Sequence, residues 1–382
     1  MFQKPFSSIL RYVLIIAIFI GSAICSYYFC RYASQRFHTP TISVVMSTYN
    51  RSKDDKDLLS RAISSILKQT FKDFELIIIN DGSDDKTAEI LKNFAKQDKR
   101  IVILTNKQNK GLPYSLNRGL DKARGKYIAR MDDDDYSLRK RFEKQVRFLD
   151  ENKHITATGC PLVFEHNHTV YPFPTDPDEA KIQTFTKVPV IHPCAMIRRD
   201  FIEKNNIRYV ETYPNAEDMP FWYDITIKHN GLISNLPDTL LYKKANAKKA
   251  ENYVPIQNKS VERYKNDAFR QIIKDKPCSN LCECYKSLAQ SEGISKILNV
   301  EKLKNYINTL NCPPDNALHV IHTYWNDYLV FDEEKRIHRF QTNDKATILE
   351  KTTNHITIKW DKWGIETFVK DKNDTYHLNK NN

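Results

Sequence analysis

The alternation of short apolar runs with amphipathic stretches in the first third of the chain constrains the fold most strongly. Residues 41–48 and 74–80 are rich in β-branched and other apolar side chains, which is typical of strands buried on both faces. Residues 54–68, between them, carry apolar side chains at helical spacing. The same pattern predicts further strands at 101–105 and 126–131, each preceded by a helix. Such alternation predicts an α/β fold, a mostly parallel sheet with helices on both faces.

Polar residues follow the predicted strands at their carboxyl ends, where ligands bind in open α/β sheets. The first strand ends in Thr48, Tyr49 and Asn50, and Asp81 follows the second. The fourth is followed by four consecutive aspartates, residues 132–135. The sequence contains neither the glycine-rich dinucleotide fingerprint nor a P-loop, so other groups must neutralise any bound phosphate.

The four aspartates predict a divalent-cation site, because adjacent carboxylates raise one another's pKa unless a cation is present. Oxygen ligands favour Mg²⁺ or Mn²⁺, which also bind substrate phosphates. A solvated turn that caps the next helix is one alternative. Another is a calcium loop with Asp132, Asp134 and Glu143 as ligands, although Tyr136 and Ser137 replace the ligand and the glycine which that loop requires. The position after a buried strand favours the Mg²⁺ or Mn²⁺ site.

Six segments between residues 41 and 242, in order, resemble glycosyltransferase family 2, nucleotide-sugar enzymes with the GT-A fold. They are ISVVMSTYN, IINDGSDDKT, NKGLPYSLNRGL, ARGKYIARMDDDD, RFEKQVRFL and HPCAMIRR. The resemblance implies a metal-dependent, inverting transfer from a nucleotide sugar, expected to be a UDP-sugar, to a hydroxyl of a glycan or glycolipid.

The resemblance also assigns roles to residues. It implies that the nucleoside is bound by Thr48, Tyr49, Asn50 and Asp81. Asp132 and Asp134 match the D-x-D motif that meets the ribose and the metal-bound diphosphate, with Asp134 as the metal ligand. Asp133 stands where the family usually has a small residue, and we count it with Asp132 among the donor-binding residues.

Residues 215–218 resemble the family's E-D motif, which implies that Asp218 is the general base that takes the proton of the acceptor hydroxyl. An acidic start of a helix is the alternative, because acidic residues favour the first helical turn. Glu217 and His192 are expected to contact the acceptor or the diphosphate, although a single histidine is as readily structural. The family's Tyr-Arg-x-His segment becomes Tyr242-Lys243-Lys244-Ala245-Asn246 here, without the histidine.

The net charge of +12 and the pI near 9.1 raise a nucleic-acid partner as another class of function. The basic residues are divided among several segments without a recognised reader motif, so we expect no nucleic-acid partner. An inactive GT-A scaffold or a glycan-binding protein is a further alternative, because a fold does not certify activity. The presence of Asp81, Asp132, Asp134 and Asp218 together favours an active enzyme.

Residues 12–30 contain no charged side chain and predict one membrane-spanning helix, with a cleaved signal peptide as the alternative. The flanking charges do not decide the orientation. A single-pass protein is therefore expected, with its catalytic domain in the cytoplasm of a bacterium or in the Golgi lumen of a eukaryote.

The remaining sequence predicts a division into an anchor (1–38), a GT-A domain (39–250), a helical extension (251–335) and a small antiparallel β module (336–382). In the module, Trp360, Trp363 and Phe368 could stack on a sugar, although such residues more often form a small core. Ordinary reduced thiols are favoured over a metal or disulfide site for the cysteines outside the anchor, which are Cys160, Cys194, Cys278, Cys282, Cys284 and Cys312.

Overall fold

The structure is a computed structural model that describes residues 39–310, except 55, 166–167, 169, 245–246 and 275–280. Beyond residue 310 it describes the backbone of strands β12 to β18. The predicted membrane segment, residues 12–30, lies outside the described residues, as do Cys278 and Cys312. Within the described part of the chain, no helix combines the length and the apolar character needed to cross a bilayer.

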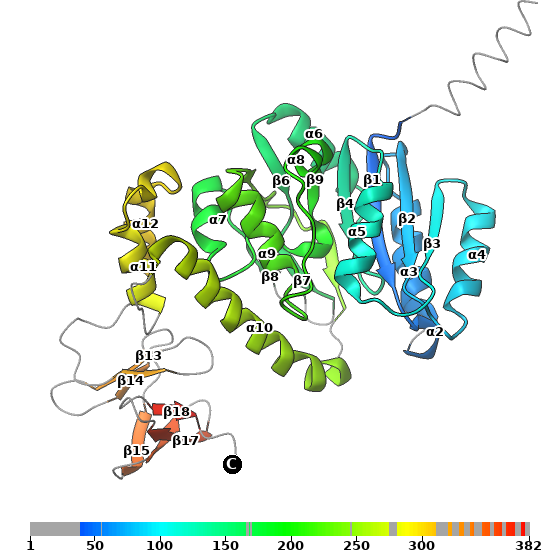
Figure 1. The fold of residues 1–382 in the computed structure, drawn as a ribbon. Helices are drawn as coiled ribbons and strands as arrows, with labels where there is room; N and C mark the ends of the chain where they lie inside the picture. The colour runs from blue at the N-terminus through cyan, green and yellow to red at the C-terminus, as the bar shows by residue number, and fades with distance from the viewer. Residues whose placement is uncertain are drawn as a thin grey trace, which may run out of the picture.

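A seven-stranded mixed sheet forms the centre of the molecule (Figure 1). Its order is β10-β6-β9-β4-β1-β2-β3. Neighbouring strands among the first four along the chain pair in parallel, as the sequence predicts: β1 (Ile42–Thr48), β2 (Phe74–Asn80), β3 (Ile101–Thr105) and β4 (Tyr127–Met131). The antiparallel strand β9 (Met196–Arg198) continues the sheet, followed by β6 (Ile155–Thr158) and β10 (Leu232–Ile233). The prediction of a mostly parallel α/β sheet is confirmed.

Helices cover both faces of this sheet, because successive strand residues point to opposite sides. In β1, Val44 and Met46 enter one hydrophobic cluster and Val45 enters the other. The first cluster receives side chains from α3 (Lys56–Leu67), α4 (Thr87–Gln97) and α6 (Arg141–Glu151). The second receives side chains from α5 (Leu112–Lys122), α8 (Arg199–Lys204) and α9 (Asp218–Tyr223). A short helix, α2 (Arg51–Asp54), precedes α3.

A smaller four-stranded sheet lies beside the carboxyl end of β4. Its order is β5 (Tyr136–Ser137), β11 (Leu241–Lys243), β7 (Leu162–Phe164) and β8 (Val170–Tyr171). Strand β5 begins directly after the four aspartates, and it pairs antiparallel with β11. This sheet therefore brings residues near 241–243 to the turn that carries the aspartates.

The predicted helical extension packs on the α/β domain through a third hydrophobic cluster. Side chains of α10 (Ala247–Ile273), α11 (Leu281–Ala289) and α12 (Val300–Thr309) meet those of α7 (Pro177–Gln183) and α9 there. Phe269 of α10 stacks on Phe185, with ring centroids 5.2 Å apart. Three single-turn helices complete the set: η1 (His192–Cys194), the π-helix η2 (Asp224–Lys228) and η3 (Ile294–Lys296).

The last part of the chain forms two antiparallel sheets. The first contains β12 (Val320–His322), β13 (Tyr328–Phe331) and β14 (Ile337–Arg339), in a region where the sequence predicts the end of the helical extension. The second contains β15 (Ala346–Lys351), β16 (His355–Trp360), β17 (Gly364–Lys370) and β18 (Tyr376–Leu378), and it agrees with the antiparallel strands predicted between residues 346 and 378. The side chains of the predicted sugar-stacking residues, Trp360, Trp363 and Phe368, lie outside the described part.

The prediction of reduced thiols is wrong for the described cysteines. Cys160 and Cys194 form a disulfide with their Cα atoms 6.2 Å apart, and both are fully buried. Cys282 and Cys284 are also disulfide-bonded. Cys160 and Cys194 are 34 positions apart in the sequence, so no local spacing indicated that they pair. Tertiary packing decides it, because Cys160, two residues after β6, meets the last residue of the single-turn helix η1 beside the central sheet.

Candidate active site

The carboxyl ends of β1 and β2 meet at the edge of the sheet, where the sequence predicts the nucleoside site. The backbone amide of Asp81 donates to the carbonyl of Thr48 at 2.9 Å, which fixes the two strand ends together. The hydroxyl Oγ1 of buried Thr48 has no hydrogen-bond partner among the described residues. Tyr49 is 45% exposed, and Asn50 adopts a left-handed conformation with φ of 50°. The edge therefore offers an open aromatic ring, and the hydroxyl that precedes it in the chain is buried without a partner.

Asp81 also holds the loop before α5. Its carboxylate accepts hydrogen bonds from the Asn106 side chain at 2.5 Å and from the backbone amides of Lys110 and Gly111, each at 2.9 Å. Gly82 follows with φ of 73°, and a Cβ atom there would lie 2.3 Å from the carbonyl carbon of Gln108. The close approach of this loop to the strand end therefore requires glycine.

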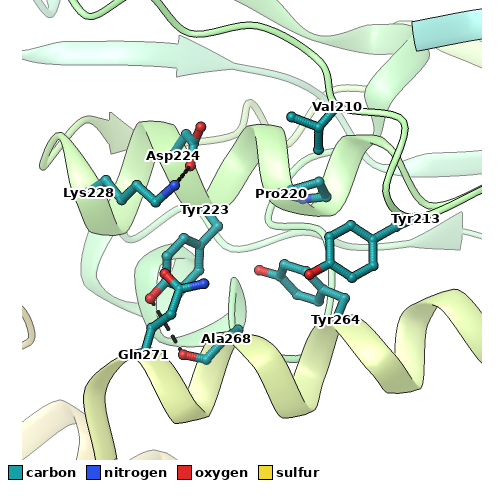
Figure 2. Close-up of a pocket in the computed structure, with 9 residues that line it drawn as sticks. All are labelled: Val210, Tyr213, Pro220, Tyr223, Asp224, Lys228, Tyr264, Ala268 and Gln271. Carbon is teal, nitrogen blue, oxygen red and sulfur yellow. Dashed lines mark hydrogen bonds and ion pairs between the residues drawn. The ribbon is translucent and has the colours of Figure 1, made fainter. Parts of the chain in front are cut away.

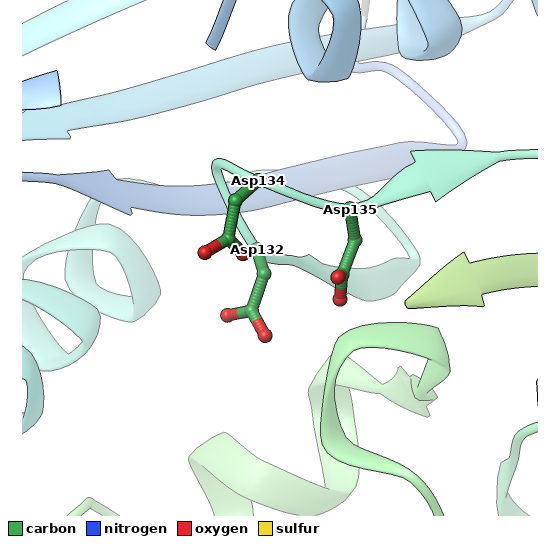
Figure 3. Close-up of side chains that lie close together, drawn as sticks. All are labelled: Asp132, Asp134 and Asp135. Atoms are coloured by element: carbon green, nitrogen blue, oxygen red, sulfur yellow. The ribbon is translucent and has the colours of Figure 1, made fainter. Parts of the chain in front are cut away.

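Three of the four consecutive aspartates come together in the turn after β4 (Figure 3). Each of Asp132, Asp134 and Asp135 offers a carboxylate oxygen, and these oxygens lie within 4.8 Å of one another. Asp135 is 1% exposed, and its Oδ2 atom has no hydrogen-bond partner among the described residues. We call these three residues the carboxylate cluster.

Asp133, which we predicted to bind the donor, does not join the cluster. It is 5% exposed and receives two hydrogen bonds from Arg51: Nε donates to Oδ2 at 2.7 Å and Nη2 donates to Oδ1 at 2.6 Å. The same Nη2 donates to Asp134 at 2.9 Å. Arg51 thus anchors the aspartate turn to the segment that follows β1.

Two further cations face the cluster. Arg130, which is buried in β4, forms an ion pair with Asp132. The Nζ atom of Lys243 lies 3.2 Å from Oδ2 of Asp132 and 3.5 Å from Oδ2 of Asp135. Both cations form an ion pair with Asp132. In the described structure, Asp135 forms its ion pair with Lys243.

Burial and these charges shift the pKa values of the cluster in opposite directions. Burial opposes ionisation of Asp132, but the positive charges of Arg130 and Lys243 prevail and hold its pKa below the usual value. Burial raises the pKa of Asp134, and the charges of Asp132 and Asp133 raise it further. Burial also raises the pKa of Asp135 to about 7, although Lys243 opposes this effect. Arg130 and Lys243 therefore stabilise the ionised form of Asp132, but the ionised forms of Asp134 and Asp135 are less well stabilised.

The carboxylate cluster fits a divalent cation. Mg²⁺ and Mn²⁺ bind carboxylate oxygens, and Asp135 presents a buried oxygen without a hydrogen-bond donor. The residues that would hold the ion are Asp132, Asp134 and Asp135. The sequence predicts a cation site at the four aspartates together, with Asp134 as the individual metal ligand.

Glu217 and Asp218 lie at the start of α9, within electrostatic range of Arg130 and Asp132. Burial raises the pKa of Asp218 to about 6. Burial and the charge of Asp218 raise the pKa of Glu217 to about 7. A carboxylate with a pKa near 6 is ionised at neutral pH and is a stronger base than an exposed aspartate, which suits proton transfer.

His192 lies in an aromatic pocket between the cluster and α9. Its Nε2 atom shares a hydrogen bond with the Tyr209 hydroxyl at 2.8 Å, and its ring meets the edge of Trp222. Burial and the charge of Arg130 lower the pKa of His192 well below its usual value, so the ring is neutral at pH 7. Tyr209 in turn stacks on Phe221 with ring centroids 4.1 Å apart. His192 is held in place by its packing against Tyr209 and Trp222.

Four residues that complete this arrangement have no individual role in the prediction from sequence, and they are Arg51, Arg130, Asp135 and Lys243. Asp135 was visible as the last of the four aspartates. Arg51 directly follows Asn50, and Arg130 precedes the aspartates by two positions. No spacing rule indicates that Lys243, 111 residues after Asp132, reaches the cluster.

A separate cavity of about 150 Å³ lies between α9, η2 and α10 (Figure 2). Tyrosine side chains and the Asp224–Lys228 ion pair contribute to its lining. None of the predicted site residues lines it. The cavity belongs to the junction with the helical extension.

Comparison with known proteins gave one family and several relatives. Residues 43–205 match the family described as Glycosyl transferase family 2. An uncharacterized glycosyltransferase of Haemophilus influenzae is 32% identical over 241 residues, covering 60% of this chain and 73% of that protein. The O-antigen biosynthesis glycosyltransferase WbnJ of Escherichia coli is 31% identical over 252 residues, covering 64% of this chain and 93% of that protein.

Solved structures are more distant. The crystal structure of S. aureus TarS in complex with UDP is 21% identical, with a TM-score of 0.47, and the superposition covers 71% of this chain and 79% of that one.

Proposed function

The chain belongs to glycosyltransferase family 2 and is a glycosyltransferase, and we propose that it transfers a sugar from a UDP-sugar to a hydroxyl group of a glycan or glycolipid. The observation that carries this proposal is the carboxylate cluster at the end of β4, with Asp218 within electrostatic range of Asp132 and Arg130. A group that can hold a metal ion and a carboxylate base in one site are what sugar transfer from a diphosphate donor requires.

The donor's nucleoside is assigned to the edge formed by β1 and β2. Tyr49 offers an exposed ring for stacking on the base. Thr48 is buried beside it, and Asn50 accepts a hydrogen bond from the backbone amide of Asp84 at 3.0 Å, so in this proposal both shape the edge next to the base. Asp81 already accepts three hydrogen bonds from its own loop, and a carboxylate has about four acceptor positions, so it has room for one donor from the nucleoside.

The diphosphate is assigned to the carboxylate cluster. When bound there, Mn²⁺ or Mg²⁺ supplies stabilisation of the negative charge that develops on the leaving nucleoside diphosphate. Asp132 and Asp134 would bind the ion through their carboxylates. Arg51 fixes the turn through its hydrogen bonds to Asp133 and Asp134. In this proposal Asp133 positions the turn and does not contact the donor.

Asp218 is assigned as the general base. Its carboxylate accepts the proton of the acceptor hydroxyl while the hydroxyl oxygen attacks the anomeric carbon from the face opposite the diphosphate. The bond from the sugar to the diphosphate oxygen breaks as the new bond forms, so the configuration at the anomeric carbon inverts. General-base catalysis of this kind contributes a factor of about 10² to 10⁴.

The acceptor and the compartment are also proposals. The relative whose name refers to O-antigen biosynthesis supports a polysaccharide or its lipid-linked precursor as acceptor. A membrane anchor at residues 12–30 agrees with a lipid-linked acceptor. The compartment stays a proposal with the two sides named above, the cytoplasm of a bacterium or the Golgi lumen of a eukaryote; the disulfides of the described domain favour the Golgi lumen, because disulfides are rare in the cytosol.

The proposal is tested by UDP release from a panel of UDP-sugars, with the purified full-length protein, Mn²⁺ and a mixture of lipid-linked acceptors. The expected result is turnover with one donor, strong loss in Asp134→Asn and in Asp218→Asn, and loss on addition of a chelator. Unchanged turnover in both variants would defeat the assignment of the two residues.

A further inference from the structure

Lys243 is placed at the carboxylate cluster by the small sheet. Strand β11 pairs with β5, so that Leu241 faces Ser137 and Tyr242 faces Tyr136. The backbone amide of Lys244 donates to Oδ1 of Asp135 at 3.1 Å, which fixes the end of β11 against the turn. The Lys243 side chain therefore starts from a backbone that is tied to one of the predicted metal ligands.

The ammonium group of Lys243 occupies a position between two carboxylates of the cluster. It lies 3.2 Å from Asp132 and 3.5 Å from Asp135. A divalent cation held by the same two carboxylates would have to lie close to this ammonium. Two positive groups at such a separation repel each other strongly in a partly buried site.

Of the cations Arg51, Arg130 and Lys243, Lys243 can most easily move away from the carboxylates that it contacts. Arg51 makes a two-point contact with Asp133, and Arg130 is 4% exposed within the central strand β4. The Lys243 side chain is 31% exposed and extends from a flexible four-carbon stem at the end of a short strand. Displacement of Lys243 leaves both arginine contacts in place.

From these contacts we propose that Lys243 and a divalent cation bind the Asp132 and Asp135 carboxylates in exclusion of each other. Lys243 neutralises the pair before the ion arrives, and it is displaced when the ion binds. Lys243 thus lowers the metal affinity of the nucleotide-free protein, and the diphosphate favours loading because its charge attracts both the ion and the displaced ammonium. The inference rests on the proposed function, because it takes the cluster as the metal site.

The test is a titration of the full-length protein with Mn²⁺ alone, in which free Mn²⁺ is measured by electron paramagnetic resonance. We expect Lys243→Met to bind Mn²⁺ about tenfold more tightly than the wild type, because a neighbouring positive charge is removed. Lys243→Arg keeps the charge and should bind within about threefold of the wild type. Lys244→Met is the matched control, since its exposed side chain lies one position away, and it should also resemble the wild type.

A second measurement uses the wild-type protein and does not depend on the folding of a variant. Amine acetylation followed by mass spectrometry should show that Mn²⁺ increases the labelling of Lys243 but leaves that of Lys244 unchanged. Two outcomes overturn the inference and leave the proposed metal site unaffected. One is equal Mn²⁺ affinity in the wild type and Lys243→Met, and the other is labelling of Lys243 that stays constant or falls when Mn²⁺ is added. Failure of both proteins to bind Mn²⁺, with or without UDP, overturns the metal part of the proposed function and the inference with it.

Discussion

Arg51 and Asp133 form a buried two-point ion pair, with Nε donating to Oδ2 at 2.7 Å and Nη2 donating to Oδ1 at 2.6 Å. The pair joins the segment after β1 to the turn after β4, across 82 residues of sequence. It explains why the second of the four aspartates turns away from the other three. One carboxylate serves the position of the turn, and the remaining carboxylates are left for a cation.

Replacement of Arg51 should therefore destabilise the protein strongly. We expect Arg51→Met to lower the free energy of unfolding by about 3–5 kcal/mol, because the charge of Asp133 is left buried without its partner. Denaturant unfolding, followed by circular dichroism, measures this change.

Arg61→Met is the control for that experiment. The ion pair between Arg61 and Glu165 is about one-third exposed on both sides, at 35% each. Exposed pairs contribute about 0–1 kcal/mol, so this variant should stay near the wild type. Equal losses in the two variants would show that the burial of the Arg51 pair has no special importance.

Asp218→Asn should remove the base and leave the donor site intact. We expect kcat to fall by about 10² to 10⁴, with UDP affinity in the presence of Mn²⁺ changed by less than about threefold. Steady-state kinetics and calorimetry measure the two quantities. Asp224→Asn is the control, because Asp224 lies six residues further along and pairs with Lys228 in the lining of the separate cavity, which contains none of the assigned site residues. A fall in kcat of similar size in Asp224→Asn would indicate that the loss comes from a disturbed helix and not from removal of the base.

The rate should depend on pH through the ionisation of Asp218. Its pKa is raised to about 6, and only the deprotonated form accepts a proton. The value of kcat should therefore be constant above that pH and fall about tenfold per unit below it. In Glu217→Gln the acid limb should stay near its place, because Glu217, whose pKa is raised to about 7, is already mostly uncharged at the pH at which Asp218 titrates. Asp218→Asn removes the titrating group and should abolish the limb, so an unchanged limb in Asp218→Asn contradicts the assignment.

The cysteine pairing can be checked by a thiol count. In the denatured, unreduced protein, Cys160, Cys194, Cys282 and Cys284 should resist alkylation, and all four should react after reduction. Mass spectrometry of the peptides gives the result directly. Alkylation of Cys160 and Cys194 without reduction would restore the interpretation as ordinary buried thiols.

The sequence by itself determined the local elements and the chemistry of the sheet edge. Strands β2 and β3 begin and end where the hydrophobic pattern predicts. Strand β2 is buried along its whole length, which favours a nearly continuous apolar run, and the edge strand β3 ends at the exposed Thr105. The aspartates after β4 were identifiable as a candidate cation site because ligand positions in such sheets follow from strand direction.

Only the tertiary structure decided which of these aspartates meet, and with what. The contact of Lys243 with Asp132 and the disulfide between Cys160 and Cys194 join segments 111 and 34 residues apart. Neither depends on a local pattern, because both arise from the pairing of edge strands and the packing of turns around the sheet. Periodicity in a sequence reports which face of an element is buried, but it does not report which distant side chain lies opposite.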